Sequence, residues 1–195
     1  MTQIGLRDRK KVRTRRVIED VALRLFAEQG FDATTIDQIV SEAEVSPRTF
    51  FRYFATKEDV VLADYSEQLD DILEDLSSRP FQETPWESMR AVFRTMASDP
   101  GRRSKMLPRA QMMANAPSVF ARSLQLQAGW EIQLATALRA RSGDKTDEIS
   151  PALMAAAALG IMRAAIRRWS EQANDIDLPE FVDECFDRLN KGFGS

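Results

Sequence analysis

The sequence predicts an all-α protein, and three observations support this fold class. No sustained alternation of apolar and polar residues indicates a strand. Capping boxes, in which the cap and the third helical residue bond to each other, are formed by Thr35 to Gln38 and by Thr84 to Glu87. Proline suits the first helical turn because its missing N–H would have no partner there. Four of the eight prolines follow a possible capping residue at such a start: Pro47, Pro85, Pro117 and Pro151.

The N-terminal part predicts three helices, at residues 10–29, 36–43 and 47–54. Apolar residues recur at helical spacing in the first two, and Gly30 ends the first. Only Glu44, Val45 and Ser46 separate the second helix from the third. Two short helices joined by so tight a turn and braced by a longer one are typical of a helix-turn-helix.

Six further helices are predicted in the rest of the chain, which makes about nine in total. We expect a domain division near Thr56, where closely spaced short helices give way to long ones. The domains are therefore residues 1–56 and 57–195. The six helices are expected at residues 57–77, 85–97, 102–114 (bent at Pro108), 117–141, 151–173 and 178–191.

Composition excludes several classes of chemistry. The chain has no histidine and one cysteine, Cys185, so neither a zinc site nor a Ser-His or Cys-His nucleophile can be built. No pair of carboxylates and no glycine-rich phosphate loop stands out, so we expect no enzyme, no metal and no cofactor. The longest strongly apolar run, at 151–162, is shorter than the roughly 20 residues that span a bilayer. We therefore expect a cytoplasmic protein without a membrane partner.

Charge is unevenly distributed along the chain. Residues 1–16 carry seven Arg or Lys side chains and one Asp, so this arm has a net charge of +6. The whole chain has a net charge of −3, which leaves −9 for the remainder. A basic arm on an acidic body indicates a polyanionic partner, but a solvated tail explains the charge equally well.

The predicted helix at 47–54 has two different sides. At about 100° per residue, Pro47, Phe50 and Phe54 share one side and can pack on the preceding helices. The opposite side presents groups that suit a DNA major groove, where Arg binds guanine and Thr or Phe contacts the thymine methyl. A solvated amphipathic helix is the alternative, but it does not explain an exposed aromatic ring. The outward groups are Arg48, Thr49, Phe51 and Arg52, with Tyr53 at the margin.

The segment Gly30–Asp59 resembles the DNA-binding signature of the TetR family of bacterial transcriptional regulators. With the first helix, the resemblance covers roughly residues 10–62, about a third of the chain. Glu44 stands at a turn position where the family usually has glycine. The resemblance implies that Thr35, Tyr53 and Lys57 bind phosphates, and that residues 7–16 add minor-groove contacts. The expected DNA-binding residues are Thr35, Ser46, Arg48, Thr49, Phe51, Arg52, Tyr53 and Lys57.

Dimerisation is the first role that the resemblance implies for the C-terminal helices. An apolar stripe on the last helix and an alanine-rich surface on the one before it allow a four-helix bundle around a twofold axis. The alternative is that both stripes pack inward within one chain. The expected interface residues are Ala157, Ile161, Ala164, Phe181, Cys185, Phe186 and Leu189.

Ligand sensing is the second implied role. Seven of the eight methionines lie between residues 89 and 162, and methionine and aromatic walls suit a flexible apolar ligand. Such residues also form ordinary cores. The basic residues Arg102, Arg103, Lys105 and Arg109 either hold an anionic head group or form a solvated face. The expected cavity residues are Trp86, Phe93, Met96, Met106, Arg109, Met113, Phe120, Trp130 and Met162.

The sequence therefore predicts a homodimeric repressor that a small hydrophobic ligand releases from a near-palindromic double-stranded DNA operator. The segments around Thr14–Arg16 and Ser46–Val61 also resemble a subgroup of actinobacterial regulators associated with acyl-CoA-type ligands, so the expected ligand is an acyl-CoA or a fatty acid. The alternative function is an acyl-binding or scaffold protein that has a basic arm but no sequence-specific role on DNA.

Overall fold

The computed structural model describes residues 6–142, 147–172 and 175–192, and all the regular elements in these ranges are helices. The all-α prediction is confirmed. Residues 1–5 of the basic arm and residue 173, the predicted end of one helix, lie outside the described ranges. The helices are α1 (Leu6–Gln29), α2 (Ile36–Glu42), α3 (Pro47–Tyr53), α4 (Lys57–Val61), α5 (Tyr65–Ser78), α6 (Pro85–Ser98), α7 (Pro100–Asn115), α8 (Pro117–Arg141), α9 (Ile149–Glu171) and α10 (Leu178–Lys191).

The chain forms two compact units whose boundary differs from the predicted one. Unit 1 contains residues up to Ala63 together with 116–122, and unit 2 contains residues 64–115 and those from 123 onward. The boundary lies after α4 because that helix packs on α1 and buries Val60 and Val61 completely. The chain therefore passes between the units at 63/64, 115/116 and 122/123.

The predicted single helix at 57–77 is wrong, because α4 and α5 are separate helices joined by a turn at residues 62–64. The amides of Leu62 and Ala63 still bond to carbonyls within α4, at 3.1 and 3.3 Å. The Ala63 carbonyl, however, accepts a hydrogen bond from the Arg15 guanidinium of α1. A side chain distant in sequence thus takes up a carbonyl that a continuous helix would have bonded internally.

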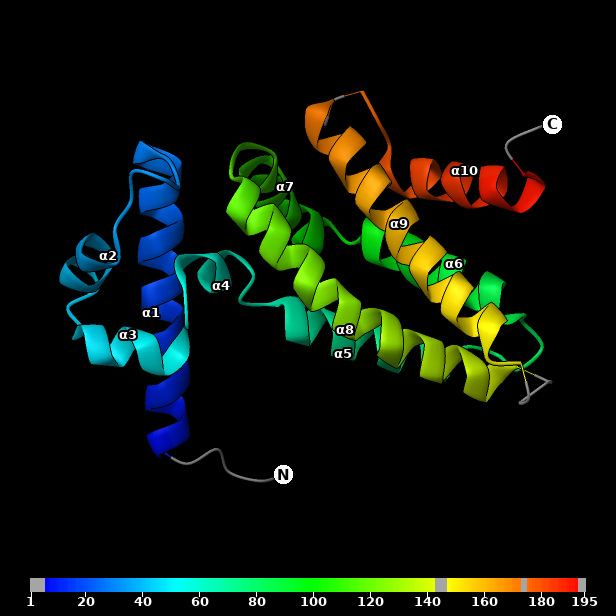
Figure 1. Ribbon diagram of the computed structural model, residues 1–195, viewed down its shortest axis with the longest axis horizontal. Coiled ribbons are helices and arrows are strands. Elements are labelled where there is room, and N and C mark those ends of the chain that lie inside the picture. The colour runs from blue at the N-terminus through cyan, green and yellow to red at the C-terminus, as the bar shows by residue number, and fades with distance from the viewer. Residues whose placement is uncertain (1–5, 143–146, 173–174, 193–195) are drawn as a thin grey trace. The chain divides into compact units, whose positions relative to one another are not determined.

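Unit 1 is built on α1, against which α2 and α4 pack, while α3 packs on α2 (Figure 1). α1 begins at Leu6, so the basic segment from residue 6 onward is part of this helix and does not form a separate arm. Ile18, Phe26, Ile39 and Phe50 fill the core at 3% exposure or less.

The turn between α2 and α3 contains a strained residue. Glu44 has a φ of 53°, in the left-handed region that side chains with a Cβ avoid. The Glu44 amide donates to the Ser41 carbonyl at 3.3 Å. The Val45 amide donates to the Val40 carbonyl at 3.0 Å. These bonds hold the tight turn that sets the direction in which α3 begins.

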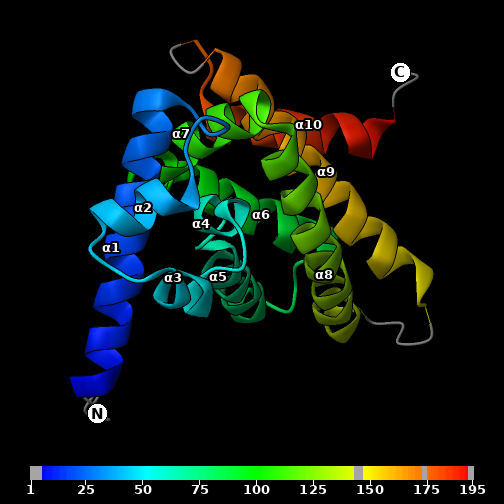
Figure 2. The same cartoon turned by 60° about the vertical axis from the view of Figure 1, so that its left-hand side comes forward.

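Unit 2 has a core between α6, α9 and α10, and the views in Figures 1 and 2 both show α10 beside α6 and α9. Phe93 and Phe186 are its largest fully buried side chains. By length and composition alone α9 also resembles a membrane-spanning helix. Its buried residues, however, pack within this core, and Arg163, Arg167 and Arg168 interrupt its C-terminal half.

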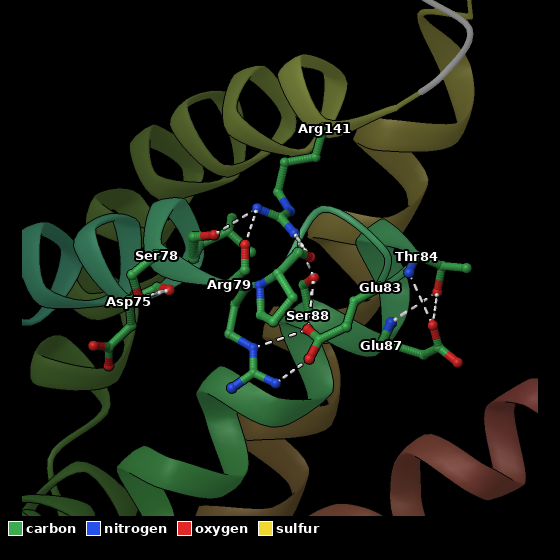
Figure 3. A network of polar contacts seen from close by, with 10 residues as sticks. Asp75, Ser78, Arg79, Glu83, Thr84, Glu87, Ser88 and Arg141 are labelled. Carbon is green, nitrogen blue, oxygen red and sulfur yellow. Dashed lines mark hydrogen bonds and ion pairs between the residues drawn. The ribbon is translucent and has the colours of Figure 1, made fainter.

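One arginine connects the end of α8 to the loop between α5 and α6 (Figure 3). The Arg141 guanidinium donates to the carbonyls of Leu76 and Arg79 at 3.1 Å, and to that of Pro80 at 2.7 Å. It also donates to the buried Ser88 hydroxyl at 3.1 Å. The C-terminal carbonyls of α5 are therefore bonded by a side chain that lies more than 60 residues along the chain.

The strained turn leads to a prediction about stability. Replacing Glu44 with glycine removes a left-handed strain of about 1–2 kcal/mol but adds about 0.5–1 kcal/mol of unfolded-chain entropy. Glu44→Gly should therefore raise the free energy of unfolding by about 0.5–1 kcal/mol, measured by equilibrium urea denaturation. Glu44→Ala keeps the strain and serves as the control, and an equal gain in both variants would contradict the argument.

Candidate DNA interface and ligand cavity

The recognition-type helix α3 has the two-sided arrangement that its sequence predicts. The Ser46 hydroxyl caps it by accepting from the Thr49 amide at 3.1 Å, and Pro47 occupies the first turn. Phe50 and Phe54 are buried, whereas Arg48 and Arg52 are exposed and Phe51 is 55% exposed. The burial of two aromatic rings thus fixes which side of α3 faces solvent.

The start of α2 and the end of α3 hold further predicted DNA-binding residues. Thr35 forms the expected capping box, since its hydroxyl accepts from the Gln38 amide at 3.2 Å and its own amide donates to the Gln38 side chain at 2.8 Å. Arg52 lies over the Tyr53 ring, 4.9 Å from its centroid, and donates to the phenol oxygen at 3.3 Å. This contact limits the orientations that the guanidinium can adopt.

Lys57 has an internal role that the sequence did not indicate. Its ammonium donates to the carbonyls of Phe31 and Thr34, at 2.9 and 2.7 Å, and lies 4.5 Å from the centroid of the Phe31 ring. It thereby attaches α4 to the loop between α1 and α2. These two bonds occupy part of the donor capacity of the ammonium, which has three N–H groups. A phosphate contact by Lys57 remains a prediction.

Unit 2 contains an apolar cavity of about 70 Å³. Helices α5 to α9 contribute to it, in agreement with the methionine-rich region of the sequence. Of the predicted residues, those that line it are Phe93, Met96, Met106, Arg109, Met113, Trp130 and Met162.

Two residues predicted for this cavity lie elsewhere. The Trp86 ring packs against Phe186, with centroids 4.7 Å apart, and faces a surface hollow next to α10. Phe120 is 46% exposed and belongs to unit 1. Both were assigned from their aromatic character alone, which does not determine the direction of a side chain.

The prediction missed several residues that line the cavity. Arg163 had a visible signal, because it interrupts the apolar run of α9. Most of the others lie on helices for which tertiary packing determines which side faces the cavity. The residues that sequence reasoning did not identify are Tyr65, Gln68, Ile72, Gln127, Leu159, Arg163 and Ile166.

Polar groups in and beside this cavity are held by specific partners. The Arg109 side chain is 8% exposed and forms an ion pair with Asp64. Arg163 donates to the Gln127 side-chain oxygen at 2.7 Å. Burial raises the pKa of the Tyr65 phenol above its ordinary value, although hydrogen bonds to Gln127 and Ser123 oppose the shift. Tyr65 therefore remains a neutral donor at physiological pH, and its hydroxyl lies 3.8 Å from the Met113 sulfur.

The other members of the predicted basic cluster have different surroundings. Arg102 forms ion pairs with Asp71 at 2.7 Å and Asp99 at 3.5 Å. Arg103 lines a separate surface hollow, and Lys105 is exposed. Of this cluster, only Arg109 lines the cavity in the described part of the chain.

Two residues of the predicted dimer surface are buried within their own chain. Phe186 is 1% exposed and packs between Trp86 and Phe93 within its own chain, so it has no surface to offer a partner. Ile161 is also largely buried, at 8%. The remaining predicted residues keep at least part of their surface accessible: Ala157, Ala164, Phe181, Cys185 and Leu189.

A surface hollow next to these residues extends the surface to α6. Leu153 is 64% exposed and lines the hollow together with the half-buried Trp86, Ala157 and Leu189 and with the polar Thr84, Glu87 and Asn190. Accessible apolar side chains gathered in this way are typical of interaction surfaces. The thiol of the adjacent Cys185 is partly buried, and this burial raises its pKa. Cys185 therefore behaves as a small apolar group.

Two family models match this chain, one in its N-terminal part and one in its C-terminal part. Residues 18–63 match the family model described as "Bacterial regulatory proteins, tetR family". Residues 83–194, more than half of the chain, match the model described as "MftR C-terminal domain".

Two curated relatives match along most of their length. The HTH-type transcriptional regulator TcmR of Streptomyces glaucescens is 35% identical over 185 residues, which cover 89% of this chain and 80% of TcmR. MftR of Mycobacterium tuberculosis, named as a mycofactocin biosynthesis transcriptional regulator, is 29% identical with 94% and 93% coverage.

Solved structures show the same fold at low identity. A TetR-family regulator from Syntrophomonas wolfei has a TM-score of 0.67 and 20% identity, and the match covers 93% of this chain and 96% of the other. FadR of Thermus thermophilus, a TetR-family repressor solved in complex with lauroyl-CoA, has a TM-score of 0.60 and 22% identity, with 93% and 95% coverage.

The internal bonds of Lys57 lead to a prediction in the absence of DNA. Lys57→Met removes the donor for two backbone carbonyls and should lower the free energy of unfolding by about 1–3 kcal/mol, measured by equilibrium denaturation. Lys11→Met removes the same charge from an exposed position on α1 and serves as the control. Equal stability of the two variants would show that the bonds of Lys57 do not stabilise unit 1.

Proposed function

Because the chain belongs to the TetR family of bacterial regulatory proteins, we propose that it is a cytoplasmic, homodimeric repressor with a near-palindromic operator. A hydrophobic ligand that enters the cavity of unit 2 releases it from DNA. The observation that carries this proposal is the arrangement of α3. Two buried aromatic side chains orient that helix so that two arginines and Phe51 face solvent.

DNA reading by α3 follows from the chemistry of its outer side. Exposed guanidiniums bind guanine edges in the major groove, and Thr49 and Phe51 supply methyl and ring surfaces for thymine. Thr35 and Tyr53 lie at the ends of the neighbouring segments, where hydroxyls bind phosphates and fix the register on DNA.

Homodimerisation is supported by the exposed and half-buried apolar side chains on α9 and α10. Leu153, Ala157 and Leu189 leave apolar surface uncovered in a single chain. A twofold interface would bury the same surface of both copies. Two copies of α3 would then meet a near-palindromic DNA site, with half-sites about 34–36 Å apart.

The ligand proposal rests on the cavity and on the complexes of related folds. Its apolar lining and its buried arginine suit an amphipathic anion, such as a fatty acid or an acyl-CoA. At about 70 Å³ it is smaller than the roughly 300–1,000 Å³ of typical ligand pockets, so a long acyl chain requires the helices around it to separate. Such a movement is the kind of change that a ligand would transmit to unit 1.

Selection of bound duplexes from random DNA, followed by footprinting, tests the proposed function. A protected palindrome is the expected result. Salt-sensitive binding without sequence preference would contradict it and would favour a protein whose basic segment meets polyanions in general.

Substitutions on α3 should change which sequence is bound. Arg48→Ala or Arg52→Ala is expected to reduce discrimination at one base pair by about 1–3 kcal/mol, measured by fluorescence anisotropy on duplexes that each carry one altered pair. Arg188→Ala removes an equal charge from α10 and should leave discrimination unchanged. If both α3 variants discriminate as the wild type does, α3 does not read the operator.

The exposed apolar surface predicts where dimerisation is sensitive. Leu153→Glu places a charge in the proposed interface and should weaken self-association at least about tenfold, measured by sedimentation equilibrium. Ile132→Glu alters an equally exposed apolar residue on α8 and serves as the control. A wild type that is monomeric at micromolar concentration, or a Leu153→Glu variant that associates normally, would contradict this interface.

A further inference from the structure

Asp64 occupies the capping position of α5 but does not cap it. Aspartate at a helix N-cap normally accepts from an amide in the first turn. Here the side chain makes no capping bond and pairs with Arg109 of α7. Its second carboxylate oxygen is buried without a hydrogen-bond partner. Buried polar atoms without partners are rare in folded proteins, so this arrangement needs an explanation.

The backbone at Asp64 is also not that of a capping residue. Its φ and ψ are −95° and 3°, whereas the residues whose side chains cap α2, α3, α4, α6 and α10 have ψ between 106° and 172°. The chain therefore enters α5 in a conformation in which the carboxylate is directed to Arg109 and not to the α5 amides.

The described residues that line the cavity of Arg109 carry positive charge only. Arg109 and Arg163 both belong to its lining, and none of the described lining residues is a carboxylate. The anion that balances Arg109 is supplied by Asp64, and Gln127 provides a neutral acceptor for Arg163. An anion inside the cavity would meet two guanidiniums at once.

We propose that the ligand of this cavity is a compact organic carboxylate, and that it acts by replacing Asp64 as the partner of Arg109. The released Asp64 then caps the first turn of α5. This inference rests on the proposed function and specifies its ligand class and its trigger.

The trigger lies at a junction between the two units. Asp64 is the first residue of unit 2 after the unit 1 segment that ends at Ala63. Adopting the ψ of a capping residue requires a rotation of about 100–170° about the Cα–C bond, from 3° at Asp64 to the 106–172° of the capping residues. With α5 held in place, this rotation changes the direction of the chain before Asp64, where the first segment of unit 1 ends at Ala63. Ligand chemistry at Arg109 is thus converted into a backbone movement at the boundary.

The cavity volume limits the size of the carboxylate. By the rule that about 10–15 Å³ of such space holds one water, it has room for roughly five to seven waters. An acid such as octanoate, with a single carboxylate and a short apolar chain, matches this space more closely than an acyl-CoA does. In an acyl-CoA the acyl end is a neutral thioester, which has no charge to exchange with Asp64.

Four variants of the full-length protein separate the roles of pairing and capping in the absence of ligand. Asparagine caps helices as well as aspartate does but is neutral, whereas alanine neither pairs nor caps. Asp64→Asn should therefore bind the wild-type-selected duplex about fivefold to tenfold more weakly than the wild type, since a cap contributes about 1 kcal/mol. Arg109→Gln should weaken binding to a similar extent, because it leaves Asp64 free to cap.

Asp64→Ala should bind the duplex close to wild-type affinity, and Asp64→Ala combined with Arg109→Gln should restore the binding that Arg109→Gln alone loses. Thermal unfolding by circular dichroism identifies any variant that fails to fold. Asp64→Asn combined with Arg109→Gln removes both charges of the pair and gives a second test of release if Arg109→Gln alone does not fold. Equal affinities for Asp64→Asn and Asp64→Ala would overturn the capping trigger.

Octanoate and octanamide form a matched pair for the ligand class. Octanoate should release the duplex from the wild type, octanamide should do so at least about tenfold less effectively, and Arg109→Gln should lose the preference for the acid. Equal action of both compounds, or no binding of either by calorimetry, would overturn the carboxylate assignment. A wild type that selects no duplex at all would instead contradict the proposed function, so the two failures can be distinguished.

Discussion

The DNA-binding unit depends on the burial of Phe50 and Phe54 beneath α3. Phe50 is fully buried, and the centroid of its ring lies 5.8 Å from that of Phe54. Arg15 of α1 lies over the Phe54 ring at 5.9 Å and also donates to the Ala63 carbonyl. One guanidinium therefore holds both the end of α3 and the end of α4. The outward direction of the remaining α3 side chains is a consequence of this packing.

Most of unit 1 could be predicted from sequence because its signals are local. Capping residues, proline at the first turn and the tight turn all act within a few positions of each other. The structure contains them, although α2 ends one residue earlier than expected, so the turn has four residues and not three. The break between α4 and α5 could not be predicted, because the contact found there, from Arg15 to the Ala63 carbonyl, joins residues 48 positions apart. The internal bonds of Lys57 were missed for the same reason.

Unit 2 was less predictable because its decisive contacts join distant segments. The methionine-rich region did locate the cavity, since seven of the nine residues proposed for it line the wall. The helical stripe of α10 could not show that Phe186 packs inward between Trp86 and Phe93 while its neighbours remain partly exposed. Nor could periodicity reveal that Arg141 bonds to the end of α5, or that Gln127 accepts from Arg163.

The proposed exchange of anions at Arg109 also has an energetic basis. A buried ion pair contributes little net stability when desolvation is counted, but leaving one partner unpaired costs about 3–5 kcal/mol. Removing Asp64 from Arg109 without a replacement should therefore cost far more free energy than exchanging it for another anion. A carboxylate that enters the cavity supplies the replacement, and the released aspartate has amides of α5 within the same turn to accept from. In the proposed exchange both charges would keep partners, so such a switch would select for anions without requiring tight binding.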